Sequence, residues 1–299
     1  MMRYLIFNSI VWLSLQSIIT GQNSKCAAIP SFTNKFGFDT KFTALSTDET
    51  SVRGLCLIDV RQKYSRSNPP FQHESWDDYG NLSTILRDPN GNCYVFGAPS
   101  VNVLYNDPLK QNTLLRVDKD SGIMAPWMEF NAGPKNTSLN PFGLLGIAYD
   151  CKTFTMYASS VYHSDRKNEK GIIYHFNPES KKILGQLADI DAIGLQVFEI
   201  GTERILLIGK ARTSDVYSIK LAPDGGFVGK PKLAFTIEGL GPRGDDKVRK
   251  FHIDAKTGDL LVFGTEFYFN LIAPSQDQAS TYRFRYDNAK KKWAFIKIE

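Results

Sequence analysis

Apolar and polar residues alternate along most of this chain in short runs that end at turn-forming residues, a pattern typical of β-strands. Four segments open with a polar residue, continue as an apolar run and close at a turn: Asp78 to Asp88, Asn140 to Asp150, Asp191 to Gly201 and Asp245 to Asp254. A second β-rich run follows each segment, for example RILLIGKA after the third. A third and a fourth run complete each unit, with a polar tip between them as in DVYSIKLAPDGG, which predicts hairpins.

These four-run units start roughly 50 to 60 residues apart, which is the period of propeller blades. Residues Lys35 to Tyr64 hold a further pair of strand-like runs, FTALST and VRGLCLIDV. No stretch has helical periodicity long enough for a crossover helix, which disfavours a parallel α/β sheet. The sequence therefore predicts an all-β fold, a β-propeller of four-stranded antiparallel blades, with five blades favoured and six as the alternative. The four segments above are expected to be its innermost strands.

The N-terminal sequence MMRYLIFNSIVWLSLQSIITGQ has one arginine followed by an apolar stretch, which is the pattern of a signal peptide. Cleavage after about Gly21 predicts a signal peptide at residues 1–22 and a single propeller domain at residues 23–299. The apolar run is short for a membrane-spanning helix, and no second apolar segment follows it. We therefore expect a secreted or periplasmic monomer with no membrane insertion after signal cleavage.

The composition is that of a globular protein, since 42% of its 299 residues are hydrophobic and 22% are charged. The formal net charge of +5 is small and, apart from Lys290 to Lys292, the basic residues are scattered, so nucleic acid is not an expected partner. The four cysteines are too few and too widely spaced for a disulfide framework. A bridge from Cys26 to Cys56 would close the shortest loop, and Cys93 and Cys151 are expected to be buried thiols.

Polar residues at the starts of the innermost strands should crowd together at one mouth of the propeller channel. We predict a metal site formed by Asp78, Asn140 and Asp191, with calcium as the cation, because hard cations prefer carboxylate and amide oxygens. Either Asp245 or Asp246 lies at the same level, and Asp246 is the predicted catalytic base. Mutual repulsion would raise at least one pKa in such a site, so Asp191→Asn is expected to leave the metal-free protein no less stable. The alternative is that these residues cap turns and bond their own backbone.

Three loop residues are candidate ligand-binding groups at the same mouth. Arg212, in KARTSD, and Arg243, in GPRGDD, are predicted to present guanidinium groups to an anionic ligand. His163, in SSVYHSDRKNEKG, is predicted to reach the mouth. Ordinary surface arginines and a polar surface loop are the alternatives. The sequence contains no nucleophile elbow, zinc-protease helix, phosphate-binding loop or dinucleotide fingerprint.

The four-strand units, the export signal and the phrases GLLGIAYD and GIIYHFNPESKKILGQL resemble the six-bladed propellers related to gluconolactonase, the senescence marker protein and strictosidine synthase. Gluconolactonase-like members bind a divalent metal through a glutamate, an asparagine and an aspartate around the channel mouth. The resemblance matches Asn140 and Asp191 to two of these positions, and Asp78 stands where the glutamate would be sought. It implies a metal-dependent lactonase or esterase-like hydrolase in which the cation polarises a carbonyl and Asp246 acts as base.

Two functions are therefore predicted. The favoured one is an exported propeller that binds a small molecule or a protein ligand at its channel mouth. The alternative is a divalent-metal-dependent hydrolase of lactones or small esters, and the fold alone does not choose between them. Three or more oxygens converging on one point would favour the hydrolase, whereas a channel filled with aromatic side chains would count against it.

Overall fold

The computed structural model describes residues 26–47, 49, 51–99, 108–130, 140–270 and 279–299. In these ranges the chain forms five antiparallel β-sheets and three one-turn helices, α1 (Phe32–Lys35), α2 (Glu74–Asp77) and α3 (Pro108–Gln111). The first sheet has two strands, β1 (Thr43–Ser46) and β2 (Cys56–Asp59), and an isolated bridge between Leu57 and Phe71 extends it.

The other four sheets have four strands each, which follow one another in chain order. The strands are β3 (Leu86–Arg87), β4 (Cys93–Phe96), β5 (Thr113–Val117) and β6 (Met124–Glu129); β7 (Leu144–Asp150), β8 (Thr155–Ser160), β9 (Ile172–Asn177) and β10 (Lys182–Ala188); β11 (Ala192–Ile200), β12 (Glu203–Lys210), β13 (Asp215–Leu221) and β14 (Phe227–Thr236); and β15 (Lys247–Ile253), β16 (Leu260–Thr265), β17 (Ser280–Asp287) and β18 (Lys292–Ile298).

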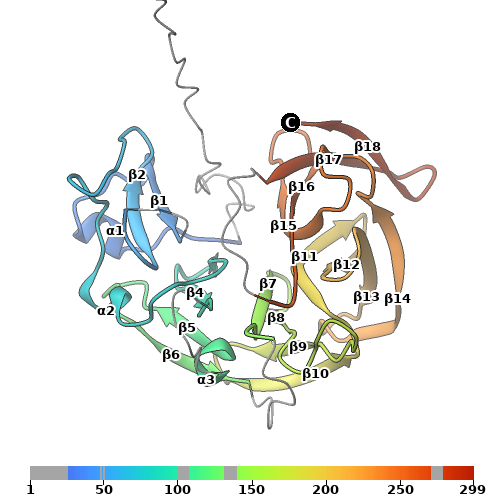
Figure 1. The fold of residues 1–299 in the computed structure, drawn as a ribbon, viewed down its shortest axis with the longest axis horizontal. Helices are drawn as coiled ribbons and strands as arrows, with labels where there is room; N and C mark the ends of the chain where they lie inside the picture. Colours follow the sequence, from blue (N-terminus) through green and yellow to red (C-terminus); the bar gives the residue numbers. More distant parts are fainter. Residues whose placement is uncertain (1–25, 48, 50, 100–107, 131–139, 271–278) are drawn as a thin grey trace, which may run out of the picture.

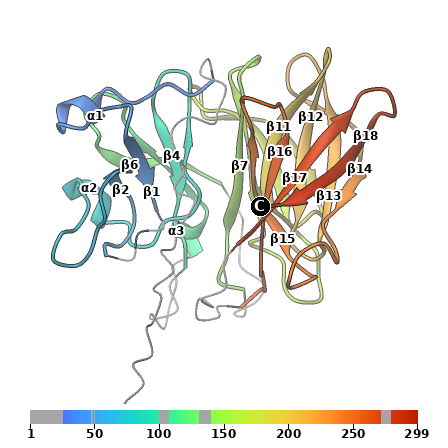
Figure 2. The ribbon, with the colours of Figure 1, turned by 90° about the horizontal axis from the view of Figure 1, so that it is seen from above.

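The five sheets stand around a common axis like the blades of a propeller (Figure 1). Strands β7, β11 and β15 lie toward the axis, and β10, β14 and β18 lie at the periphery (Figure 1). The strands run roughly along the viewing direction of Figure 1, as the rotated view shows (Figure 2). Neighbouring first strands are in contact, β7 with β3 and with β11, and β11 with β15. The predicted all-β propeller with five blades is confirmed, and so are the inner positions of β7, β11 and β15.

The predicted inner strand from Asp78 to Asp88 is mostly not a strand. Asp78 is the C-terminal cap of α2, Leu82 makes an isolated antiparallel bridge with Gly97, and only β3 at the end of the segment forms a strand. The ring of His73 caps the N-terminus of this helix by accepting a hydrogen bond from the N–H two residues on, at 3.2 Å. Trp76 in the same turn is fully buried. The start of the predicted strand is therefore the end of a capped helical turn, and its second half pairs irregularly with β4.

Apolar cores join consecutive sheets. One core lies between each pair of neighbours from the first sheet to the fifth, and representative members are Trp76, Phe96, Tyr157 and Phe284. In the last of these cores the rings of Phe235 and Phe284 have centroids 4.3 Å apart. Among the described residues no apolar core joins the fifth sheet back to the first. Four sheet-to-sheet cores therefore hold five blades together.

Aspartates set the turns that follow three of the inner strands. Asp88, Asp150 and Asp254 each accept a hydrogen bond on Oδ1 from the N–H two residues on, at 2.8, 3.0 and 2.9 Å. In these Asx turns the carboxylate replaces a main-chain acceptor, which favours a tight reversal. The turn chemistry at this end of the sheets is therefore local, and it fixes where the second strand of each blade begins.

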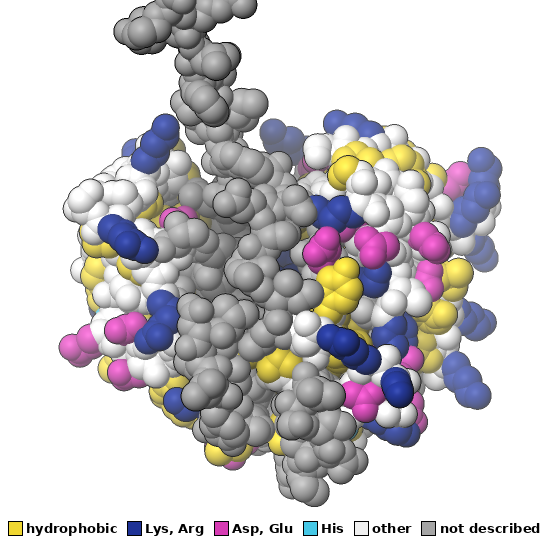
Figure 3. Space-filling model, in the orientation of Figure 1, with side chains coloured by type: hydrophobic (Ala, Val, Ile, Leu, Met, Phe, Trp, Pro, Cys, Tyr) yellow, Lys and Arg dark blue, Asp and Glu magenta, His cyan; other side chains and the backbone are white. Residues whose placement is uncertain are grey.

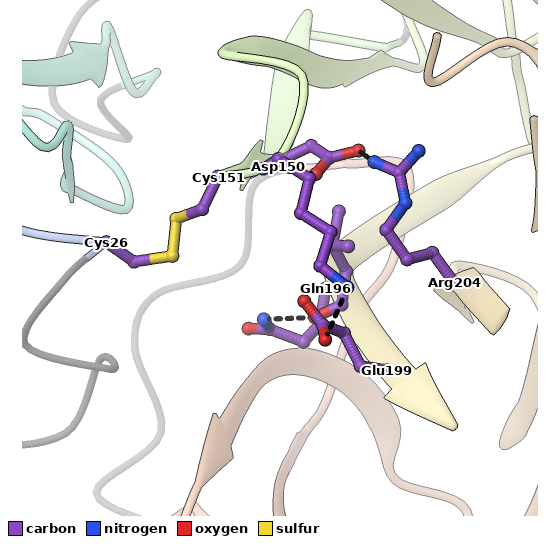
Figure 4. The surroundings of a disulfide bond; sticks show 8 residues. Cys26, Asp150, Cys151, Gln196, Glu199 and Arg204 are labelled. Atoms are coloured by element: carbon purple, nitrogen blue, oxygen red, sulfur yellow. Dashed lines mark hydrogen bonds and ion pairs between the residues drawn. A yellow bond between two sulfur atoms is a disulfide. The ribbon is translucent and has the colours of Figure 1, made fainter. Parts of the chain in front are cut away.

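A disulfide joins Cys26 to Cys151, whose Cα atoms lie 5.5 Å apart across 125 residues of sequence (Figure 4). The predicted bridge from Cys26 to Cys56 is wrong, and so is the prediction of a free thiol at Cys151. Cys56 and Cys93 are free and buried. The short loop was misleading because the segment after Cys26 pairs with the second blade, where the N–H of Ala28 donates to the carbonyl of Asp88 at 3.0 Å. That path brings Cys26 beside the turn after β7.

Next to this disulfide a buried ion pair links the third and fourth blades. Arg204 on β12 donates to the Asp150 carboxylate at the end of β7 (Figure 4). Its guanidinium also donates to the carbonyls of Ala222 and Pro223, at 2.7 and 2.8 Å. Both charged side chains are therefore satisfied at the inter-blade boundary, as buried charges must be.

No helix within the described ranges is long and apolar enough to cross a membrane. The predicted signal peptide, residues 1–22, lies outside the described residues.

Candidate functional site

Three polar residues precede the inner strands at one end of the channel, which we call the mouth. Asp191 and Asp246 directly precede β11 and β15, and Asn140 precedes β7 by four residues. All three side chains have an exposed fraction of 0%. Because buried polar atoms are nearly always hydrogen-bonded, their partners determine what this end of the channel can do.

The carboxylate of Asp191 is bonded on both oxygens. Its Oδ1 accepts hydrogen bonds from the Gly171 N–H at 2.9 Å and from the Ser164 hydroxyl. Its Oδ2 accepts from Nε of Arg212 at 2.6 Å. Burial raises the pKa of Asp191, and the bonds from Ser164 and Arg212 oppose that rise. The carboxylate is therefore held by the protein and does not project into the channel.

The guanidinium of Arg212 also stabilises the loop around Asp165 and Arg166, and we call such an arginine a brace. Besides Asp191, it donates to the carbonyls of Asp165 at 2.7 Å and Arg166 at 3.2 Å. Its Cζ lies 4.7 Å from the centroid of the Phe269 ring. The loop that Arg212 holds is also closed by its own hydrogen bonds, since the Asn168 amide donates to Oδ2 of Asp165 at 2.9 Å. This bond and those from main-chain N–H groups lower the pKa of Asp165. Arg212 donates to Asp191 beside β11 and to the loop carbonyls, so its donors are used by the protein, and ligand binding by Arg212 stays a prediction.

Asp246 and Arg243 form a second bonded pair at the start of β15. Nε and Nη2 of Arg243 donate to the two oxygens of Asp246, at 2.5 and 3.1 Å. The Tyr282 hydroxyl also donates to Oδ2 of Asp246 at 2.7 Å. Burial, together with this bond, raises the pKa of Tyr282 to about 12. A Cβ on Gly241 would lie 1.9 Å from the Tyr282 oxygen, so the loop can pass there only as glycine. Asp246 accepts three hydrogen bonds, which does not suit the role of a free base.

The side chain of Asn140 is also hydrogen-bonded within its own blade. Its Nδ2 donates to the carbonyls of Val161 at 2.6 Å and Ser164 at 2.9 Å, and its Oδ1 accepts from the N–H two residues on at 2.9 Å. Asn140 therefore fixes the path of the chain into β7.

His163, the third predicted ligand-binding residue, packs edge-on against Tyr162, with ring centroids 5.0 Å apart.

The structure does not gather the predicted metal ligands into one site. Asp78 caps α2. The residue that takes the place of Asp191 in the second blade is Asn81, because the pair of Leu82 with Gly97 corresponds to that of Ala192 with Lys210. The carbonyl of Asn81 accepts from the N–H of Ala98 at 2.8 Å, and that of Asp191 accepts from the N–H of Ala211 at 2.9 Å. Within the described ranges no group of three or more His, Cys, Asp or Glu side chains is placed to hold a metal. Since Asn140 and Asp191 already accept protein donors, these residues do not fit a calcium site, and no mechanistic step through a metal follows from them.

Beside these bonded pairs lies an apolar cluster, which we call the mouth cluster. It comprises Val161, Ile193, Ala211 and Phe269, which are buried, and Phe142, Leu145 and Phe267, which are half-buried. The Phe267 centroid lies 5.1 Å from that of Phe142 and 5.3 Å from that of Phe269. Tyr268, between two of these aromatics in sequence, is 47% exposed. The sequence reasoning missed this cluster, although the run FYF after β16, without alternation, was a signal for it.

A hollow of about 610 Å³ lies elsewhere, on the outer rim between β6 and β10. Its lining includes Trp127, Lys181 and Ile183. The indole N–H of Trp127 donates to the Pro178 carbonyl at 2.8 Å, and Nζ of Lys181 lies 4.0 Å from the ring centroid. These contacts join two blades, so we interpret the hollow as a feature of blade packing. On the face shown in Figure 3, Lys and Arg side chains are scattered among acidic and apolar ones.

No protein-family model and no curated protein matches the sequence. Several solved structures are similar in shape. Hydrazine synthase of Kuenenia stuttgartiensis has a TM-score of 0.39 at 10% identity, over 85% of this chain and 79% of that one. A GH43 β-1,3-galactosidase in complex with galactodeoxynojirimycin has a TM-score of 0.44 at 8% identity, over 77% of each chain. A glucose dehydrogenase has a TM-score of 0.40 at 12% identity, over 75% of this chain and 72% of that one.

Likeness this distant carries no statement about activity or ligand, and the propeller assignment rests on the sheet topology of the chain itself. The propeller fold that the gluconolactonase resemblance implied is thus observed, whereas membership of that superfamily stays a prediction.

Proposed function

We propose that this protein is an exported β-propeller that binds a small molecule at its channel mouth, on the mouth cluster. The observation that supports this proposal most directly is the mouth cluster, in which half-buried Phe142 and Phe267 lie beside the exposed Tyr268. Partly exposed aromatic side chains that converge in one place are typical of ligand sites, because they offer apolar area at low entropic cost. The arginine braces at Asp191 and Asp246 support the proposal, since they hold the surrounding loops in place before a ligand arrives.

Export is supported by the disulfide from Cys26 to Cys151, because disulfides persist in oxidising compartments. The measurement is the intact mass of protein recovered outside the cytoplasm. We expect a chain that begins near residue 22, and a chain that begins at Met1 would contradict export with cleavage.

Binding at the mouth is tested by ligand-observed NMR with a mixture of uncharged cyclic compounds, namely cyclohexanol, phenol and inositol. We expect saturation transfer to at least one compound in the parent protein and its loss in Phe267→Ala combined with Tyr268→Ala. Leu233→Ala on β14 is the matched control, because this side chain is 58% exposed and lies on an outer strand. Equal signals in the mouth variant and the control would refute the location, and selective capture of a protein would point to the protein ligand instead.

The alternative function, a metal-dependent hydrolase, stays a prediction from the sequence. No observation in the described part of the chain favours it, since Asp246 is bonded by Arg243 and Tyr282.

A further inference from the structure

Two buried carboxamide side chains lie at the end of α3, between the second and third blades: Gln111 is its last residue and Asn112 follows it. Gln111 is 5% exposed and Asn112 is 3% exposed. A Cβ on Gly97 would lie 2.8 Å from the carbonyl oxygen of Lys110, and a Cβ on Gly143 would lie 2.2 Å from that of Gln111. Only glycine permits such an approach, so this segment is wedged between the end of β4 and the start of β7.

Each carboxamide has a buried polar atom without a partner. Oε1 of Gln111 and Nδ2 of Asn112 make no hydrogen bond. The other amide atom of Asn112, Oδ1, accepts from the Ser160 hydroxyl at 2.8 Å. Exchanging oxygen and nitrogen in either amide would only turn an unpaired acceptor into an unpaired donor, or the reverse. Buried polar atoms are nearly always bonded, so two unpaired ones on adjacent residues indicate a missing partner.

The chemistry of this pair limits what the partner can be. A partner of the Gln111 oxygen must be a donor and a partner of the Asn112 nitrogen must be an acceptor, and an alcohol hydroxyl can be both. The groups that already bond this segment are neutral, namely the Ser160 hydroxyl and the N–H of Phe130, which donates to the Asn112 carbonyl. An ion buried beside them would lose its hydration without gaining a counter-charge. A resident water has the same bonding capacity and is the alternative that the experiment must exclude.

The carboxamide pair adjoins the mouth cluster through the chain leading into β7. Gly143, which touches Gln111, directly follows Phe142, and the Phe142 ring centroid is 5.1 Å from that of Phe267. A ligand with an apolar face on these rings would have its polar edge close to the carboxamides. The apolar and the neutral polar parts of the mouth are therefore neighbours.

We propose that Gln111 and Asn112 form a subsite that recognises a hydroxyl group on an uncharged ligand of the mouth. The subsite rests on the proposed binding function. The Gln111 oxygen accepts the hydroxyl proton, and the Asn112 amide donates to the hydroxyl oxygen. Gly97 and Gly143 pack closely against the backbone of Lys110 and Gln111, which fixes the segment that carries the carboxamides. Since Oε1 of Gln111 and Nδ2 of Asn112 have no protein partner, the ligand replaces no bond of these two atoms.

The test combines two measurements on the parent protein and on Gln111→Met, with Gln62→Met as control because Gln62 is exposed. Ligand-observed NMR uses glycerol, erythritol and inositol, together with glycerate as a charged counterpart of glycerol. We expect the parent to bind a polyol but not glycerate, and Gln111→Met to bind the polyol about tenfold more weakly, the effect of one neutral hydrogen bond. Gln111→Met should also raise the melting temperature by about 2 °C without ligand, because it removes an unpaired buried atom.

Four results would overturn the subsite. Two concern the parent protein alone: it binds no polyol, or it binds glycerate as strongly as glycerol. A lower melting temperature in Gln111→Met, with the control unchanged, would show that a resident water already satisfies the amide. Polyol binding that survives Gln111→Met but is lost in Phe267→Ala would overturn the subsite while leaving the binding function standing. If the cyclic compounds also fail to bind the parent protein, both the subsite and the proposed binding function are refuted.

Discussion

Asp191→Asn tests whether the carboxylates at the mouth are braces or ligands. In the structure, Asp191 has an exposed fraction of 0% and accepts hydrogen bonds from Gly171, Ser164 and Arg212. An asparagine keeps one acceptor for Gly171 and Ser164 but turns its amide nitrogen toward Nε of Arg212. Two donors then face each other, and the guanidinium loses its counter-charge.

The expected loss of stability is about 3 kcal/mol. Removing one partner of a buried ion pair costs roughly 3 to 5 kcal/mol, and we take the lower end because the Arg212 side chain is 19% exposed and keeps its carbonyl partners. For a chain of this length, such a loss lowers the melting temperature by about 6 °C. A cation site at Asp191 would instead predict a metal-free variant no less stable than the parent, because the substitution would delete a like charge.

Urea denaturation and thermal melts of four proteins measure this effect: the parent, Asp191→Asn, Arg212→Met and the double variant. We expect the double variant to be more stable than the sum of the single losses implies, because its partners are removed together. Asp189→Asn is the matched control, since its carboxylate is 69% exposed and pairs with Lys170 only at 3.4 Å. If the free energy of unfolding of Asp191→Asn lies within about 0.5 kcal/mol of that of the parent, the stabilising role of the Asp191–Arg212 pair is refuted.

Three further outcomes are expected. Replacing Cys26 and Cys151 by serine should lower the free energy of unfolding by about 2 to 4 kcal/mol, and non-reducing peptide mapping of the parent should recover the Cys26–Cys151 peptide; a peptide linking Cys26 to Cys56 would contradict the structure. Burial lowers the pKa of His175, so the stability it contributes is complete above the unfolded value of about 6.5 and declines as pH falls below it. His175→Phe should therefore flatten the melting temperature between about pH 6.5 and 5, and an unchanged slope would argue against a buried neutral imidazole. Millimolar calcium should shift the parent melting temperature by less than about 1 °C, because arginine already bonds the mouth aspartate Asp191; a rise that grows with the logarithm of free calcium would restore the metal site.

The repeat could be predicted from the sequence because blade strands leave a regular trace. Each blade needs four short alternating runs, and the observed strands from β7 to β18 follow the predicted units in order. The segment from Asp78 to Asp88 was predicted only in part: its end is the inner strand β3, whereas its start is the cap of the helix that His73 begins, and helix capping does not depend on alternation. Sequence spacing also misjudged the disulfide, since the shortest loop is favoured only when nothing else orders the chain.

The candidate site was harder to predict because its partners are distant in sequence. Arg212 lies 21 residues from Asp191, and nothing in the motif KARTSD shows that it pairs with that carboxylate. The pair of Arg243 and Asp246 is only three residues apart and was accessible to sequence reasoning as an ion pair. The unpaired amides of Gln111 and Asn112 leave no trace in the sequence, because being unpaired is a property of packing alone.

The two sides of the mouth therefore differ in how their polar groups are used. Around β11 and β15, buried Asp191 and Asp246 are bonded by arginines, so a ligand would have to break strong charge-assisted bonds to reach them. Beside β7, the carboxamides of Gln111 and Asn112 have unused capacity, so a ligand hydroxyl would gain hydrogen bonds there without displacing any protein partner. Because binding energy is gained where polar groups are unpaired and rigidly held, we expect ligand recognition on the β7 side of the mouth and a structural role for the charged pairs on the other side.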